Sequence, residues 1–261
     1  MKKKLLITLG CSFTEGVGCY DMSVMPEGVK YCGLSKEEKK YQTDRFHSLG
    51  WPNQVGKQLG FDKVVNLSKG GTSNSFSAKM LVERVMGNRE FLCYDVYIIW
   101  MATEPTRFSF FDGTFISNFL PSSHEGIGLS HAYFKSIKEY DLGGLNEQVF
   151  YIKVIEQVCE NNNFNLLIVN WSTSFKRLVQ LYNSKYFLFE TPPNVLDRAK
   201  LTEEDTSFCG HPNESGYKKI AEVIVDNVKN LRKDFVVGKP KEDMEWEWQG
   251  SNNFPDKVFK S

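Results

Sequence analysis

The chain has 261 residues, of which 41% are hydrophobic and 25% charged, proportions that fit a globular protein with a substantial core. Its 32 basic residues balance 32 acidic ones, so charge gives no argument for a nucleic-acid partner or for an anionic membrane surface. No apolar run approaches the roughly 18 residues of a membrane span. We expect a cytoplasmic protein, either of the producing cell or of a virus that replicates in it.

The cysteines and histidines give no sign of a metal site. None of the six cysteines has the CxxC spacing of a zinc site or clusters with histidines. His47, His124 and His131 lack acidic or cysteine neighbours at ligand spacing. The sequence therefore predicts free thiols in a reducing compartment, with neither a metal nor an organic cofactor.

Near-continuous apolar runs predict buried strands at residues 4–9, 63–67, 95–101, 165–171 and, more weakly, 186–189. Such runs, rather than alternating ones, are typical of strands covered on both faces. Helical spacing of apolar residues predicts helices between and after them, at 48–59, 73–89, 145–162 and 214–231. This order predicts a three-layer α/β/α sandwich of flavodoxin-like type, with a mainly parallel sheet of about five strands.

Three segments do not fit this repeat. Inserts at about 19–46 and 106–144 read as irregular, and they follow strands whose carboxyl ends should carry a site. They are expected to be lids, pocket walls or simple surface decoration. A single domain is predicted over residues 1–235. The tail at 236–261 is expected to pack on its own domain or on a partner, in a homo-oligomer or a virus particle.

Four short blocks of polar and glycine residues lie at the boundaries of these elements. GCSFTEG (10–16) follows the first strand, NLSKGGTSN (66–74) the second and WMATEPTR (100–107) the third, while CGHPNESGY (209–217) opens the last helix. Ligands bind open α/β sheets at the carboxyl ends of the strands. We therefore expect the blocks to converge on one rim of the sheet.

In order and spacing, the four blocks resemble those of the SGNH (GDSL-like) hydrolase superfamily, especially its compact phage and bacterial members. The resemblance runs from Gly10 to Tyr217. It implies that Ser12 is the nucleophile of an acyl transfer and that its backbone N–H is one oxyanion donor. It also implies that the backbone N–H of Gly71 is a second donor and that His211 is the general base.

The sequence departs from the family pattern at several supporting positions. Cys11 stands where the family usually has Asp, and Thr103 stands where it supplies an Asn as third oxyanion donor. Asn74 is a candidate to compensate for that loss. Phe208 replaces the aspartate that orients the histidine. Asp205 is the candidate orienting acid; otherwise a backbone carbonyl holds the ring and leaves a Ser–His dyad.

Two charged residues in the third block have an open role. Glu104 and Arg107 flank a proline after the third strand. They either bind a polar substrate or pair with each other, and pairing is the favoured interpretation. A serine after a strand and a His-Pro pair before a helix are each common in ordinary turns and helix caps. Taken together with the block order, however, they predict that Ser12 and His211 face each other.

The leading hypothesis is a serine esterase that acts on an O-acyl ester, such as an acetylated carbohydrate or another small ester. The alternative is a catalytically weakened binding or structural protein on the same scaffold, for example a virion component, because two supporting residues are missing. A nucleotide-binding flavodoxin-like protein with a phosphate loop at 10–18 is disfavoured. That segment matches neither GxxxxGK[ST] nor GxGxxG.

Overall fold

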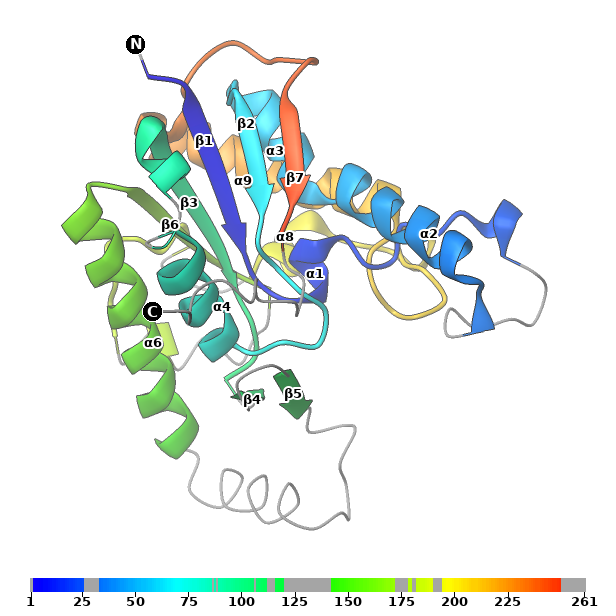
Figure 1. Ribbon diagram of the computed structural model, residues 1–261, viewed down its shortest axis with the longest axis horizontal. Coiled ribbons are helices and arrows are strands. Elements are labelled where there is room, and N and C mark those ends of the chain that lie inside the picture. Colours follow the sequence, from blue (N-terminus) through cyan, green and yellow to red (C-terminus); the bar gives the residue numbers. More distant parts are fainter. Residues whose placement is uncertain are drawn as a thin grey trace.

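A computed structural model of the chain describes residues 2–25, 33–85, 87, 89–105, 107–111, 116–119, 142–171, 178–179, 182–189 and 194–249. Its centre is a five-stranded sheet in the order β6-β3-β1-β2-β7 (Figure 1). Every pairing in this sheet is parallel. The strands are β1 (Lys4–Leu9), β2 (Lys63–Asn66), β3 (Asp95–Ala102), β6 (Asn165–Asn170) and β7 (Glu245–Trp248).

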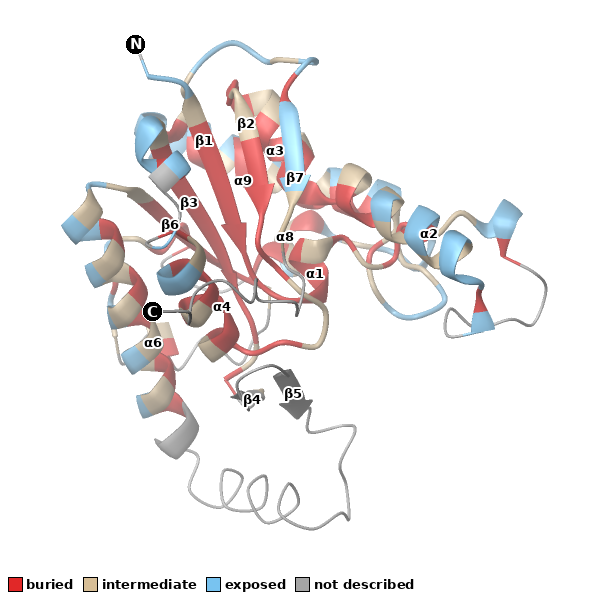
Figure 2. Cartoon of the chain, viewed as in Figure 1, coloured by how far each residue is buried: buried red, intermediate tan, exposed pale blue. Residues whose placement is uncertain are grey.

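Helices cover both faces of the sheet, so that its central strands are buried (Figure 2). On one face lie α3 (Trp51–Leu59), α8 (Val195–Ala199) and α9 (Glu214–Leu231). On the other lie α4 (Asn74–Met80), the π-helical turn η3 (Leu81–Val85) and α6 (Leu142–Asn162). Successive strand residues enter opposite cores, as the pleat requires. The predicted α/β sandwich is confirmed.

The first insert is more regular than expected. After the short turn η1 (Met22–Val24), its last part forms the start of α2 (Lys36–Leu49), which projects away from the sheet (Figure 1). A capping box begins this helix: Glu38 N–H donates to Ser35 Oγ over 3.2 Å, and Ser35 N–H donates to Glu38 Oε2 over 2.8 Å. The charged residues at 36–40, in the insert that we read as irregular, thus form the first turns of a helix. The helix expected at 48–59 is split at Gly50 into the end of α2 and α3.

The second insert contains a short antiparallel hairpin of β4 (Phe108–Phe111) and β5 (Ile116–Phe119). Residues 120–141 of that insert lie outside the described residues. The remaining short elements are the 3-10 turns η4 (Arg89–Cys93), η6 (Glu203–Asp205) and η7 (Lys233–Phe235). None of the helices described is long and apolar enough to cross a membrane.

The fifth strand is not the one that the sequence predicts. The segment 186–189 makes only an isolated parallel bridge, between Phe187 and Ile168. The fifth strand is β7, from the segment predicted to be a tail, and it pairs with β2 from Lys63↔Glu245 to Asn66↔Trp248. Its Glu-Trp-Glu-Trp sequence is largely exposed at the sheet edge, so no apolar run marked it. The domain therefore extends past the predicted boundary at 235.

The edge pairing of β7 predicts a position-specific effect of proline. The N–H groups of Glu245 and Gln249 donate to Asp62 and Asn66, over 3.2 and 2.9 Å, so the N–H of Glu247 faces β2 as well. Glu247→Pro should lower the free energy of unfolding by about 2–3 kcal/mol because proline removes this donor. Glu247→Ala, which keeps the N–H, should stay within about 0.5 kcal/mol. Urea unfolding of both variants tests this, and equal midpoints would contradict the pairing.

Candidate active site

The nucleophile candidate lies where the central strand ends. β1 stops at Leu9, and its next residues turn into the single-turn helix α1 (Ser12–Glu15). The carbonyl of Cys11 accepts the N–H groups of Thr14 and Glu15, each over 2.9 Å. Ser12 therefore lies at the carboxyl rim of the sheet, and only 6% of its surface is exposed.

Three long-range hydrogen bonds hold α1 in place. The Asn66 amide donates to the Thr14 carbonyl over 2.8 Å, and the hydroxyl of buried Tyr217 donates to Val17 O over 2.8 Å. Burial raises the pKa of Tyr217 well above its usual value, so the hydroxyl stays a donor. The Glu15 carboxylate accepts the N–H of Gly70 over 2.5 Å. These contacts tie the nucleophile turn to the second and fourth blocks.

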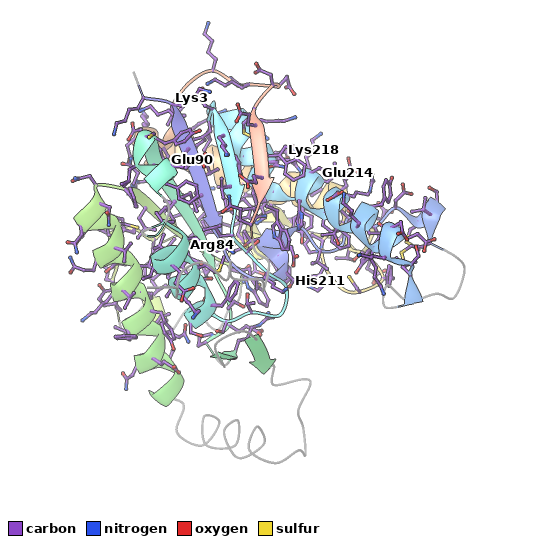
Figure 3. All side chains as sticks on the ribbon, viewed as in Figure 1. Lys3, Arg84, Glu90, His211, Glu214 and Lys218 are labelled. Atoms are coloured by element: carbon purple, nitrogen blue, oxygen red, sulfur yellow. The ribbon has the colours of Figure 1, made fainter. Side chains whose placement is uncertain are left out.

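His211 lies at the end of a tight turn before α9. The carbonyl of His211 accepts the N–H of Ser207 over 2.8 Å, and Asn213 caps the helix by accepting the N–H of Gly216 over 3.1 Å. Figure 3 shows His211 beside α1 at the rim to which β1 points. Its Nε2 lies 2.8 Å from Ser12 Oγ, although 199 residues separate them. The structure thus brings together the two residues predicted to face each other.

Gly18 allows the two blocks to approach this closely. Its φ of +120° lies in the region that disfavours side chains. A Cβ added there would lie 2.2 Å from the carbonyl oxygen of Pro212 and 3.0 Å from Cβ of His211. The backbone after α1 therefore packs directly against the turn that carries the histidine.

Asp205 does not orient His211, and this expectation is corrected. Its carboxylate accepts the Thr202 N–H over 2.9 Å, the Ser215 hydroxyl over 2.7 Å and the Lys219 ammonium over 2.6 Å. Within the described part of the chain, the partners of this carboxylate do not include the His211 ring. Asp205 instead stabilises the first turns of α9 through Ser215 and Lys219.

Asn74 is likewise a brace rather than a free donor. Its amide donates to the carbonyl of Thr103 over 2.9 Å and to Gln148 Oε1 over 2.5 Å, while its Oδ1 accepts the N–H of Thr103 over 2.8 Å. Both amide hydrogens are used, so Asn74 cannot compensate for the missing family Asn. The buried Thr103 hydroxyl has no hydrogen-bond partner among the described residues.

Glu104 and Arg107 pair with each other, as the favoured interpretation had it, at 3.2 Å between Arg107 Nε and Glu104 Oε2. The guanidinium also lies 5.2 Å from the ring centroid of Trp171, which follows β6. Trp171 stacks on Phe13 at 4.4 Å, and the Phe13 ring lies 5.1 Å from that of His211. Two stacked aromatic rings, those of Phe13 and Trp171, therefore stand beside the candidate base.

Sequence reasoning missed several members of this site. Glu15 and Phe13 lie inside the first block and Trp171 ends the fourth expected strand, so position alone could have suggested them. Cys209 opens the fourth block, and its Sγ lies 3.4 Å from Nδ1 of His211. No group of acidic, cysteine and histidine side chains in the described residues could hold a metal ion.

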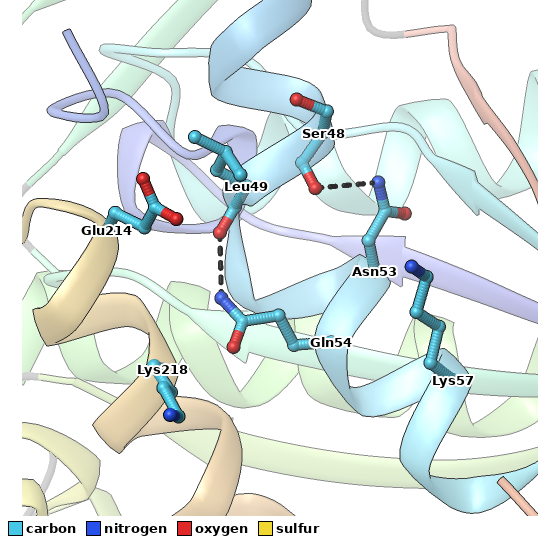
Figure 4. A pocket seen from close by; sticks show the side chains of 7 residues that line it. All are labelled: Ser48, Leu49, Asn53, Gln54, Lys57, Glu214 and Lys218. Atoms are coloured by element: carbon cyan, nitrogen blue, oxygen red, sulfur yellow. Dashed lines mark hydrogen bonds between the residues drawn. The ribbon is translucent and has the colours of Figure 1, made fainter. Parts of the chain in front are cut away.

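Two surface hollows flank the helices. One of about 190 Å³ lies between the junction of α2 with α3 and the start of α9 (Figure 4). Its amides are engaged locally: Gln54 donates to the Leu49 carbonyl over 2.8 Å and Asn53 to the Ser48 carbonyl over 3.4 Å. Neither Ser12 nor His211 lines it. The second, of about 480 Å³, includes Phe13 and Pro212 in its wall and so adjoins the Ser12–His211 pair.

Comparison with known proteins adds evidence on the fold. No protein-family model and no curated protein matches the sequence. The crystal structure of TesA matches with a TM-score of 0.51 and 12% identity, over 87% of this chain and 99% of TesA. The chain shares its overall fold with TesA.

A second solved structure is the lipase Lip_vut3 from a goat rumen metagenome, with a TM-score of 0.44 and 16% identity, over 86% of this chain and 97% of the lipase. At such identities structural likeness speaks only to the fold. The function of this chain therefore depends on the geometry of its own site.

The close approach at Gly18 predicts that a single methyl group disturbs the site. Gly18→Ala should lower the free energy of unfolding by about 2 kcal/mol or more, through a strained φ and the clash with Pro212. Gly87→Ala is the matched control, because a Cβ there meets nothing within 4 Å. Thermal and urea unfolding measure the difference. Equal stability of the two variants would contradict the packing of Gly18 against the histidine turn.

The environment of Asp205 predicts a pH dependence of stability. Lys219, the Thr202 N–H and Ser215 hold the pKa of its carboxyl well below the usual value of about 3.9. A depressed pKa in the folded state stabilises the fold above about pH 3.9 and loses that contribution as the pH falls toward the folded value. Asp205→Asn should therefore be less stable than wild type at pH 7, and the gap should narrow below about pH 4. Urea titrations at pH 7 and at several pH values below about 4 test it; a gap that stays constant over this range would contradict the role.

Proposed function

We propose that this chain is a serine hydrolase that cleaves O-acyl esters through an acyl-enzyme on Ser12. The observation that carries the proposal is the hydrogen bond of 2.8 Å between Ser12 Oγ and His211 Nε2. It joins a hydroxyl at the carboxyl end of the central strand to a base at the start of the last helix. This pairing of nucleophile and base is what acyl transfer by serine requires.

The chemistry follows from this pair. His211 Nε2 takes the proton of Ser12 as Oγ forms a bond to the acyl carbon, and the carbonyl oxygen becomes an oxyanion. The bond to the leaving alcohol then breaks, and that alcohol takes the proton from Nε2. Water repeats the sequence on the acyl-enzyme: Nε2 accepts its proton, the carboxylic acid leaves and Ser12 regains its hydrogen. No metal or organic cofactor is needed for these steps.

Backbone donors beside Ser12 support the same role. In the described part of the chain, neither the N–H of Ser12 nor that of Gly71 has an acceptor. The turn that carries Gly71 lies next to the nucleophile: a Cβ added to Gly70 would lie 3.6 Å from Cβ of Ser12. The Glu15–Gly70 hydrogen bond fixes that turn. We infer that these two N–H groups, with the Thr103 hydroxyl, stabilise the oxyanion.

The hollow beside the pair favours a small ester. Its wall combines the apolar Phe13, Leu196 and Pro212 with the charged Asp197 and Lys200. Such a mixed lining fits a substrate with an apolar acyl group and a polar alcohol. An acylated carbohydrate has this chemistry, and we propose it as the substrate class.

The proposal predicts that activity depends on both members of the pair. Ser12→Ala and His211→Ala should each lower kcat for p-nitrophenyl acetate hydrolysis by about 10³-fold or more, with the fold intact by circular dichroism. A fluorophosphonate probe should label wild-type protein at Ser12, as located by mass spectrometry of peptides. Ser23→Ala, which removes an exposed hydroxyl from the turn before α2, should behave as wild type.

Activity and labelling that survive Ser12→Ala would contradict the proposal. Absence of both from wild-type protein, with acylated sugars still bound, would favour a binding protein on the same scaffold. The replaced family positions, Thr103 and Phe208, are the features that would then account for the loss.

A further inference from the structure

The ring of His211 needs a partner on the side that faces away from Ser12. A histidine acts as base at Nε2 only when its proton sits on Nδ1, and a group that accepts the Nδ1–H fixes that tautomer. Phe208 occupies the family position of the orienting acid, and its side chain is 61% exposed. The carboxylate of Asp205 is engaged by Thr202, Ser215 and Lys219. The usual orienting group is therefore absent from its usual place.

The thiol of Cys209 occupies that side of the ring. Its Sγ lies 3.4 Å from Nδ1 of His211 and 3.0 Å from Oγ of Ser207. The N–H of Ser207 donates to the carbonyl of His211 over 2.8 Å and closes the turn that presents the sulfur. The single hydrogen of the Ser207 hydroxyl has two acceptors 3.0 Å away, that carbonyl and, in the thiolate form, the sulfur. Gly210, at φ +77°, supplies the left-handed residue in this turn. Sulfur, imidazole and the Ser12 hydroxyl thus form one chain of hydrogen-bonding groups.

We propose that Cys209 is the positioning residue of His211, taking the place of the missing acid in a Ser12–His211–Cys209 relay. The inference rests on the proposed hydrolase function and adds a third member to that site. In the thiolate form, Sγ accepts the Nδ1–H, leaves the Nε2 lone pair toward Ser12 and stabilises the imidazolium that forms in the transition state. In the thiol form, an S–H that donates to Nδ1 selects the opposite tautomer, which cannot accept the serine proton.

The surroundings of the thiol place its ionisation near neutral pH. Partial burial opposes the thiolate, but hydrogen bonds from His211 and Ser207 outweigh it and lower the pKa of Cys209 to about 7. The groups that face the sulfur are that ring and hydroxyl, with solvent on the open side. The hydroxyl of Tyr217, buried under the site, stays neutral because burial raises its pKa. The ionisation of the thiol should therefore shape the activity profile.

Substitution of Cys209 tests the relay through kinetics. Cys209→Ala should lower kcat for p-nitrophenyl acetate about 10- to 100-fold with little change in KM, as expected for loss of a hydrogen bond to a charged group. Cys209→Asp should recover most of kcat and move the acid limb of the pH–rate profile to lower pH, because a carboxylate ionises below a thiol. Cys93→Ala is the matched control: it removes another exposed free cysteine, which precedes β3 at the opposite rim of the sheet, and should match wild type.

The ring of His211 gives a second measurement that needs no substrate. Nitrogen-15 NMR of the histidine rings, with His211→Ala for assignment, should show an Nδ1–H tautomer in wild type. In Cys209→Ala the His211 signals should shift toward the Nε2–H tautomer. Wild-type kcat, pH profile and tautomer in Cys209→Ala would overturn the relay. The hydrolase proposal would fail on a different result, namely activity that does not depend on Ser12. The tautomer of His211 in Cys209→Ala is measured without substrate, so it tests the relay separately.

Discussion

The hydrogen bond between Ser12 and His211 is the contact on which the site depends, and it closes a loop of 199 residues. Such a long loop is held only if both ends are fixed by the core. Tyr217, fully buried on α9, reaches the backbone after α1, and Gly18 lets that backbone touch the histidine turn. The two reacting groups therefore meet because the central strand and the last helix share one hydrophobic core.

The acidic residues near the site act on the scaffold rather than on the chemistry. Glu15 holds the Gly70–Gly71 turn against α1, and Asp205 holds the first turns of α9. Each carboxylate holds a segment of the chain that lies next to a residue proposed to react. The side of the imidazole that an acid occupies in the family pattern is left to sulfur from Cys209. A thiol orients the imidazole less strongly than a carboxylate would, so the activity of the site should depend more strongly on pH.

The parts of the site that the sequence predicted are those with local signals. Three motifs can each be recognised within a few residues: a strand that ends in Gly-Cys-Ser, a Gly-Gly turn and a His-Pro-Asn helix cap. Their order along the chain predicted that Ser12 faces His211. The roles of Asp205 and Asn74 were predicted wrongly because they depend on partners such as Lys219 and Gln148, which no local pattern indicates.

In the fold as well, elements with a local sequence signal were predicted and elements that depend on distant contacts were not. The strands β6, β3, β1 and β2 were predictable because burial on both faces demands continuous apolar runs. The edge strand β7 was not, since its exposed side chains alternate between Glu and Trp and its pairing with β2 is a long-range event. The helix α2 was also missed, because its capping box precedes a charged run instead of an apolar stripe.

The covalent intermediate tests the central claim most directly. Protein mixed with p-nitrophenyl acetate and quenched in acid during turnover should carry one acetyl group, and peptide mass spectrometry should place it on Ser12. The acetyl group should be absent from Ser12→Ala. Turnover of the ester without an acetylated Ser12, or with the acetyl group on another side chain, would contradict the account.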